Sequence, residues 1–167
     1  VYEWITQTDD PDLISPHARL RISIQGAVNF HDMSDAEYTM AGIRITDPLA
    51  GTAWTRGSTR TVKWVAAGAV TNGVDVDFSS DGGTTWTNVQ VAVPCVVGEN
   101  TYEWDIVADN PSPNAVLRMT SRDEPRIHAQ SDVFTVADID IKAPLADAEW
   151  QTLQTNEIAW TAGGAGN

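Results

Sequence analysis

The chain is poor in cysteine and in positive charge, and both shortages limit what it can be. A single cysteine, Cys95, stands among 167 residues, so the chain has no internal disulfide framework. Ten lysines and arginines face 23 aspartates and glutamates, which gives a formal net charge of -13 at pH 7 and a pI of about 4.3. A field of this sign repels phosphate backbones and anionic membrane surfaces, so we expect no nucleic-acid binding. No apolar run is long enough to span a bilayer, and we expect no membrane insertion in this segment.

Sequence signatures of catalysis are also missing. Serine, histidine and aspartate are present, but there is no nucleophile-elbow motif, no paired catalytic carboxylate signature and no phosphate-binding glycine loop. We therefore expect that the chain is not an enzyme and that it carries no catalytic residue and no cofactor.

Helical periodicity is absent, and alternating short strands take its place. Apolar and polar residues alternate in about seven runs, centred on residues 43–45, 61–64, 74–78, 86–91, 102–106, 115–119 and 134–136. Prolines and glycines punctuate the connections between the runs. About seven strands in a unit of this size are typical of an immunoglobulin-like β-sandwich, so the expected fold class is all-β.

The chain repeats itself at an interval as long as a whole domain. Six of the seven tryptophans form pairs about 96 to 100 residues apart: Trp4 with Trp104, Trp54 with Trp150, and Trp64 with Trp160. A period of this length predicts tandem immunoglobulin-like sandwiches. The predicted units are residues 1–41, the C-terminal part of one repeat; residues 42–138, a complete repeat; and residues 139–167, the N-terminal part of a further repeat.

Two explanations of the incomplete end units stay open. The chain is an excerpt from a longer array, or neighbouring subunits complete one another by strand exchange. Joining the two ends would still lack the equivalent of residues 72–100, which favours the excerpt. Neither junction between units contains a flexible spacer, so we expect closely coupled units that form a stiff rod.

The complete unit resembles a known immunoglobulin-like module. The resemblance is carried by the string Ile43-x-Ile45-x-x-Pro48-x-x-Gly51-x-x-Trp54-x-x-Gly57-x-x-x-x-Val62-x-Trp64. It is similar to the N-terminal domain of the Ser/Thr-rich GPI-anchored and yeast cell-wall β-glucan assembly family, and similar modules occur as repeats in large secreted proteins. The resemblance implies a sandwich fold and assigns no catalytic residue. The third unit departs from the string, with Asp147 in place of the first glycine and Leu153 in place of the second.

A second, shorter resemblance lies after the third predicted strand. Residues Ser79, Asp81, Gly83, Thr85 and Trp86 match the Asp-box pattern Ser-x-Asp-x-Gly-x-Thr-Trp of sialidase propellers and other secreted proteins. In such a turn the carboxylate accepts backbone N–H bonds and the glycine supplies a positive φ. We expect a structural turn here. A propeller would need several boxes, and the sequence has one.

Acidic residues near the predicted junctions are candidate metal ligands. The candidates are Asp9, Asp10, Asp12, Asp47, Asp138 and Asp140. Carboxylates gathered on loops can ligate Ca²⁺, which takes six to eight oxygens, but no EF-hand spacing is present. The competing interpretation is a solvated acidic surface, and it is the one that we favour.

The tryptophans allow two functional interpretations. Exposed tryptophan rings would stack on sugars, whereas rings at regular fold positions pack in the core, which we favour. Trp54 and Trp150 follow a loop, and we expect these two to be partly exposed. The resulting prediction is a structural or adhesive module of a long extracellular or cell-surface repeat protein that self-associates through neighbouring repeats or edge strands. The alternative is a carbohydrate-binding accessory module of a secreted enzyme or adhesin, with cell-surface glycans as partners.

Overall fold

The computed structural model describes residues 13–106 and 111–164, and this part of the chain contains strands but no α-helix. In chain order the strands are β1 (Ser15–Ala18), β2 (Arg21–Ile24), β3 (Ala27–Met33), β4 (Tyr38–Met40), β5 (Gly42–Asp47), β6 (Ala53–Thr55), β7 (Thr59–Ala67), β8 (Val74–Ser79), β9 (Thr87–Val93), β10 (Gly98–Asp105), β11 (Ser112–Ser121), β12 (His128–Gln130), β13 (Phe134–Ala143) and β14 (Ala159–Gly163). None of the described residues belongs to a helix long and apolar enough to cross a membrane. The expected all-β class is confirmed.

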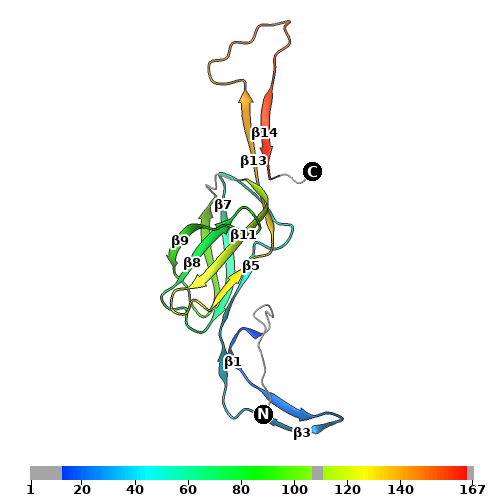
Figure 1. Cartoon of the computed structure of the whole chain (residues 1–167), viewed down its shortest axis with the longest axis vertical. Coiled ribbons are helices and arrows are strands. Elements are labelled where there is room, and N and C mark those ends of the chain that lie inside the picture. Colours follow the sequence, from blue (N-terminus) through cyan, green and yellow to red (C-terminus); the bar gives the residue numbers. More distant parts are fainter. Residues whose placement is uncertain (1–12, 107–110, 165–167) are drawn as a thin grey trace.

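Strands β5 to β13 form a two-layered sandwich in the middle of the molecule (Figure 1). One layer has the order β10-β7-β5, and the other has the order β13-β11-β8-β9, with β12 paired to β11 and β6 paired to β13. The seven longer strands coincide with the seven runs expected from the alternation, and the three-residue strands β6 and β12 were not foreseen. The arrangement is that of an immunoglobulin-like β-sandwich.

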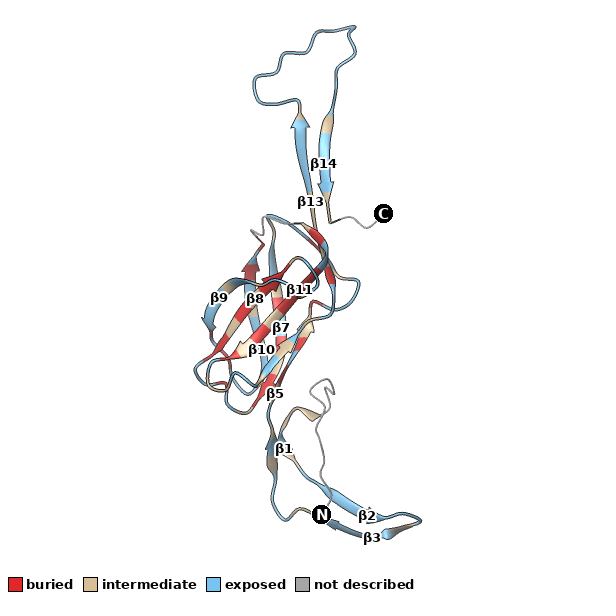
Figure 2. Ribbon diagram, in the orientation of Figure 1, coloured by how far each residue is buried: buried red, intermediate tan, exposed pale blue. Residues whose placement is uncertain are grey.

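The core fills the space between the two layers (Figure 2). On β7, Val62 and Trp64 are buried while Lys63 between them is exposed, which is the alternation of a strand with one covered face. Trp54 on β6 reaches across the layers: its ring centroid lies 6.0 Å from that of Trp104 and 5.1 Å from that of Phe134. The expectation that Trp54 is partly exposed is therefore wrong, because pairing of β6 with β13 turns this ring inward and leaves it 6% exposed.

Two-stranded pieces extend from both ends of the sandwich (Figure 1). On the N-terminal side β1 pairs with β4 and β2 pairs with β3, and on the C-terminal side β14 pairs with the second half of β13. Strand β13 runs without a break from the sandwich into this C-terminal hairpin, and Ala41 alone separates β4 from β5. The end pieces are thus direct continuations of strands of the sandwich or its neighbours.

The end pieces have the same strand register as the corresponding parts of the sandwich. The matched Cα pairs are Ile141–Trp160 with Ile45–Trp64, Ser23–His31 with Thr120–His128, and Ala18–Tyr38 with Ala115–Phe134. The irregularity after Ile45 in the β5–β7 pair recurs after Ile141 in the β13–β14 pair. Residues that match in the sequence therefore also occupy matching positions in the strand ladders.

The two sequence departures of the third unit fall on left-handed backbone. Gly51 has a φ of 79° and Gly57 a φ of 76°, and their counterparts Asp147 and Leu153 have φ values of 66° and 64°. A side chain at such a φ is strained, because its Cβ approaches the following carbonyl oxygen. The backbone of the third unit keeps the turn conformations of the sandwich although the residues no longer favour them.

Burial predicts a sharp difference between two matched leucines. Leu117 on β11 is 0% exposed, and Leu20, just before β2, is 43% exposed. Leu117→Ala should lower the free energy of unfolding by about 2–5 kcal/mol, because it removes buried methyl groups and leaves a cavity. Leu20→Ala should change it by less than about 0.5 kcal/mol. Urea unfolding at low protein concentration, followed by tryptophan fluorescence, measures both, and equal losses would contradict the assigned core.

Candidate interaction surfaces at the two ends

The Asp81 side chain holds the turn after β8 together. Its Oδ1 accepts the N–H groups of Thr84 and Thr85 at 3.0 and 2.8 Å, and its Oδ2 accepts the Thr85 hydroxyl at 2.7 Å. The Ser79 hydroxyl donates to Asp81 Oδ1 at 2.7 Å and accepts the N–H of Gly83 at 2.8 Å. Hydrogen bonds from Thr85, and then from Ser79, lower the pKa of Asp81 to about 2. At neutral pH this carboxylate is ionised and its oxygens are engaged within the turn.

Trp86 completes this turn and is covered by an arginine from a neighbouring strand. The guanidinium carbon of Arg118 lies 4.2 Å from the centroid of the Trp86 ring, and its Nη2 donates to Asp77 Oδ2 at 2.8 Å. The five residues of the Asp-box pattern therefore lie together on one turn, and the hydrogen bonds that they make are internal to the chain. Their arrangement is that of a structural turn.

The carboxylates considered as calcium ligands lie apart or beside basic groups. Asp138 accepts a hydrogen bond from Arg56 at 2.8 Å, Asp140 is paired with Lys142, and Asp47 lies at the end of β5. Within residues 13–106 and 111–164, no three Asp, Glu, His or Cys side chains are grouped closely enough to hold a metal ion. The candidates Asp9, Asp10 and Asp12, and also Trp4, lie outside the described residues.

Large apolar side chains are exposed on one face of the C-terminal hairpin. This C-terminal apolar face consists of Ile139, Ile141, Ile158 and Trp160, which are 61–71% exposed. Their counterparts in the sandwich, Ile43, Ile45, Val62 and Trp64, are 0–7% exposed. Residue types and strand register agree, so the difference in exposure arises because the second layer that covers β5 and β7 has no equivalent over β13 and β14. Trp150 beside this face is 47% exposed, as expected from the sequence.

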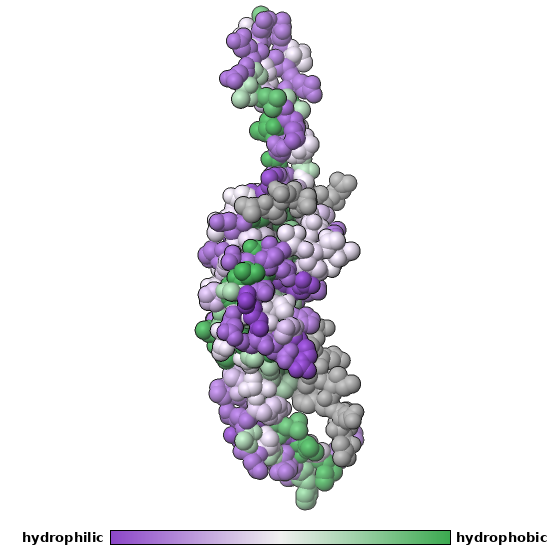
Figure 3. All heavy atoms as spheres, turned by 60° about the vertical axis from the view of Figure 1, so that its left-hand side comes forward, coloured by the Kyte–Doolittle hydropathy of each residue, from purple (hydrophilic) through white to green (hydrophobic). Residues whose placement is uncertain are grey.

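A second apolar face lies on the N-terminal pieces. This N-terminal apolar face consists of Leu20, Ile22, Ile24 and Phe30, which are 43–68% exposed. Three of these residues have counterparts, Leu117, Met119 and Ile127, that lie in or against the sandwich core. Figure 3 shows hydrophobic atoms gathered over the lower hairpin and over the upper one.

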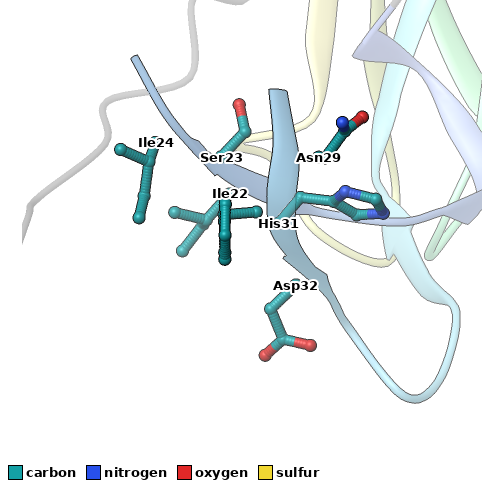
Figure 4. A pocket seen from close by; sticks show the side chains of 7 residues that line it. Ile22, Ser23, Ile24, Asn29, His31 and Asp32 are labelled. Atoms are coloured by element: carbon teal, nitrogen blue, oxygen red, sulfur yellow. The ribbon is translucent and has the colours of Figure 1, made fainter. Parts of the chain in front are cut away.

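The β2–β3 hairpin also forms an open hollow of about 510 Å³ (Figure 4). Its lining residues are Ile22, Ser23, Ile24, Asn29, Phe30, His31 and Asp32. The sequence pattern did not single out this region, although the string Ser-Pro-x-Ala-x-Leu-Arg at residues 15–21 repeats at residues 112–118 and marks it as the counterpart of β11. The hollow is open because nothing in the chain covers this side of the hairpin.

Comparison with known proteins adds little to this description. No protein-family model matches the chain, and no curated protein matches it. A solved structure of fibronectin(III)-like modules of CbhA from Clostridium thermocellum is similar, with a TM-score of 0.32 and 16% sequence identity over 72% of this chain. The chain spans 62% of the length of that structure. The function therefore has to be inferred from the chain's own residues.

The lowered pKa of Asp81 predicts an acid-dependent contribution to stability. The pKa falls from 3.8 to about 2 on folding, so the ionised carboxylate stabilises the fold fully above about pH 4. Below that pH the unfolded chain takes up its proton first, and the contribution is lost by about pH 2. Asp81→Asn should therefore be less stable than the wild type at pH 7 and equally stable near pH 2.

Denaturant unfolding of both proteins across this pH range measures the difference. Glu149→Gln, at an exposed position of the C-terminal hairpin, is the control for removing one negative charge. A stability difference for Asp81→Asn that does not change with pH would refute the role of the charged form.

Proposed function

We propose that the chain is a structural or adhesive module of a long extracellular repeat protein, in which successive sandwiches form a stiff rod. Its main support is the way in which the sandwich continues into its neighbours. Phe134 and Val136 of β13 are buried in the sandwich, and Ile139 and Ile141 of the same strand pair with β14. A strand shared in this way couples two units, because rotation between them would break ladder hydrogen bonds that the backbone needs.

Close backbone packing at both junctions supports the same proposal. A Cβ added at Gly42, at the start of β5, would stand 2.8 Å from Cγ1 of Ile14. A Cβ added at Gly163, on β14, would stand 2.4 Å from Cγ of Pro111. Arg56 of the sandwich also donates to Asp138, at the point where β13 leaves it. These contacts join each end piece to the sandwich and leave little room for hinge motion.

A carbohydrate-binding role has less support from the described aromatic residues. Trp54, Trp64 and Trp104 are 1–6% exposed and present no ring face to a sugar. The rings of Phe30 and Trp160 are exposed, but they lie on end pieces at opposite sides of the sandwich (Figure 2). A sugar chain is recognised by aromatic faces arranged on one surface. The structural role is therefore the better supported of the two. The resemblance to the cell-wall assembly module, which supports an extracellular location, stays a prediction.

Stiffness can be tested by loosening one junction. Inserting Gly-Ser-Gly-Ser between Ala41 and Gly42 should uncouple the N-terminal pieces from the sandwich, because such a linker behaves as a flexible coil. Small-angle X-ray scattering should then show a broader distance distribution, and NMR relaxation should show faster tumbling of the N-terminal pieces alone.

The same insertion at Gly26 serves as the control. Gly26 lies at the exposed tip of the β2–β3 turn, where an added Cβ would meet nothing within 4 Å. This variant should keep the scattering profile and the uniform relaxation of the wild type. Independent tumbling of the end pieces in the wild type itself would overturn the rod proposal.

A further inference from the structure

We propose that the two apolar faces are complementary halves of one binding site and that a second copy of this chain supplies the other half. Copies would then join head to tail, with the C-terminal apolar face of one copy on the N-terminal apolar face of the next. This inference rests on the proposed structural function and names the partner at each end of the module.

The sandwich itself is the template for this joint. The counterparts of the C-terminal apolar face on β5 and β7 lie in one core cluster with Leu117 and Met119 of β11, and Ile127 packs against that cluster. These three residues are the counterparts of Leu20, Ile22 and Phe30 in the N-terminal apolar face. The chain therefore carries, at its two ends, copies of two surfaces that bind each other in its middle.

One chain cannot bring its own two faces together. They lie at opposite ends of the molecule, with the whole sandwich between them (Figures 1 and 2). The strands that carry them continue directly from the sandwich, which fixes the faces apart. A second copy meets no such restriction, because its N-terminal pieces are free to approach the exposed β13–β14 hairpin.

A specific aromatic contact is expected in the joint. In the sandwich the Trp54 ring lies 5.1 Å from the Phe134 ring. Trp150 matches the first of these residues in the sequence, and Tyr38 matches the second in the strand register. The joint should therefore place Tyr38 of one copy against Trp150 of the next.

The joint is smaller than the sandwich, and it is asymmetric. Neither end of the chain supplies counterparts of β8 and β9, so Val74, Val76 and Phe78 of the core have no equivalent there. Association should accordingly be reversible. Because the contact joins two different surfaces, it leaves one free face at each end of every assembly, and copies can add indefinitely to form open chains.

Charge substitutions on one face at a time test the arrangement. Ile22 and Ile141 are 68% and 62% exposed, so replacing either by lysine should leave the isolated fold intact. Sedimentation velocity should show that the average mass of the wild type rises with concentration above the monomer mass of 18.1 kDa. Ile22→Lys alone and Ile141→Lys alone should stay monomeric, and an equimolar mixture of the two should form dimers and nothing larger, because each variant keeps one intact face.

Val91→Lys is the matched control, since Val91 is a 52% exposed strand residue of the sandwich outside both faces. It should assemble like the wild type, and far-UV circular dichroism should show the same strand content for all four proteins. A wild type that remains monomeric up to about 1 mM would overturn the proposal. So would self-association of Ile22→Lys alone, which would indicate symmetric pairing of C-terminal faces. Neither result bears on the stiffness of the junctions, which is measured separately by scattering and relaxation.

Discussion

The structure depends on covering the apolar face of the β7–β5 sheet with a second layer. Trp64 and Trp160 show this most clearly, because they occupy the same ladder position and differ in exposure, at 1% and 62%. Burying a large aromatic side chain is among the largest single contributions that a residue makes to a small core. Where the covering layer is present the chain forms a stable sandwich, and where it is absent the same residues form an adhesive surface.

Features that depend on neighbours in the sequence could be predicted from the sequence. The seven longer strands followed from alternation with a period of two, which is a property of the strand itself. The turn around Asp81 was also predicted, since its partners Ser79, Gly83, Thr84 and Thr85 all lie within four residues of it. In both cases the forces that determine the local structure act between residues that are close in the chain.

Features that depend on distant partners could not be predicted in the same way. Trp54 was expected to be partly exposed, but it is buried because β6 pairs with β13, about 80 residues further along the chain. Asp138 was considered as a metal ligand, but the residue that it accepts a hydrogen bond from, Arg56, is 82 residues away. The two apolar faces were missed for a related reason, since composition and periodicity cannot tell a covered strand from an uncovered one.

The distribution of charge and apolar surface favours growth of the module along one direction. Side chains of one sign dominate the chain, whose formal net charge is -13, so lateral contact between parallel rods brings like charges together. The apolar faces lie at the ends, where Ile22 and Ile141 would be buried on contact. Repulsion between the sides combined with attraction between the ends selects linear assemblies over lateral aggregates. The acidity of the chain thus complements its apolar ends, because it directs self-association to the surfaces that the sandwich architecture leaves uncovered.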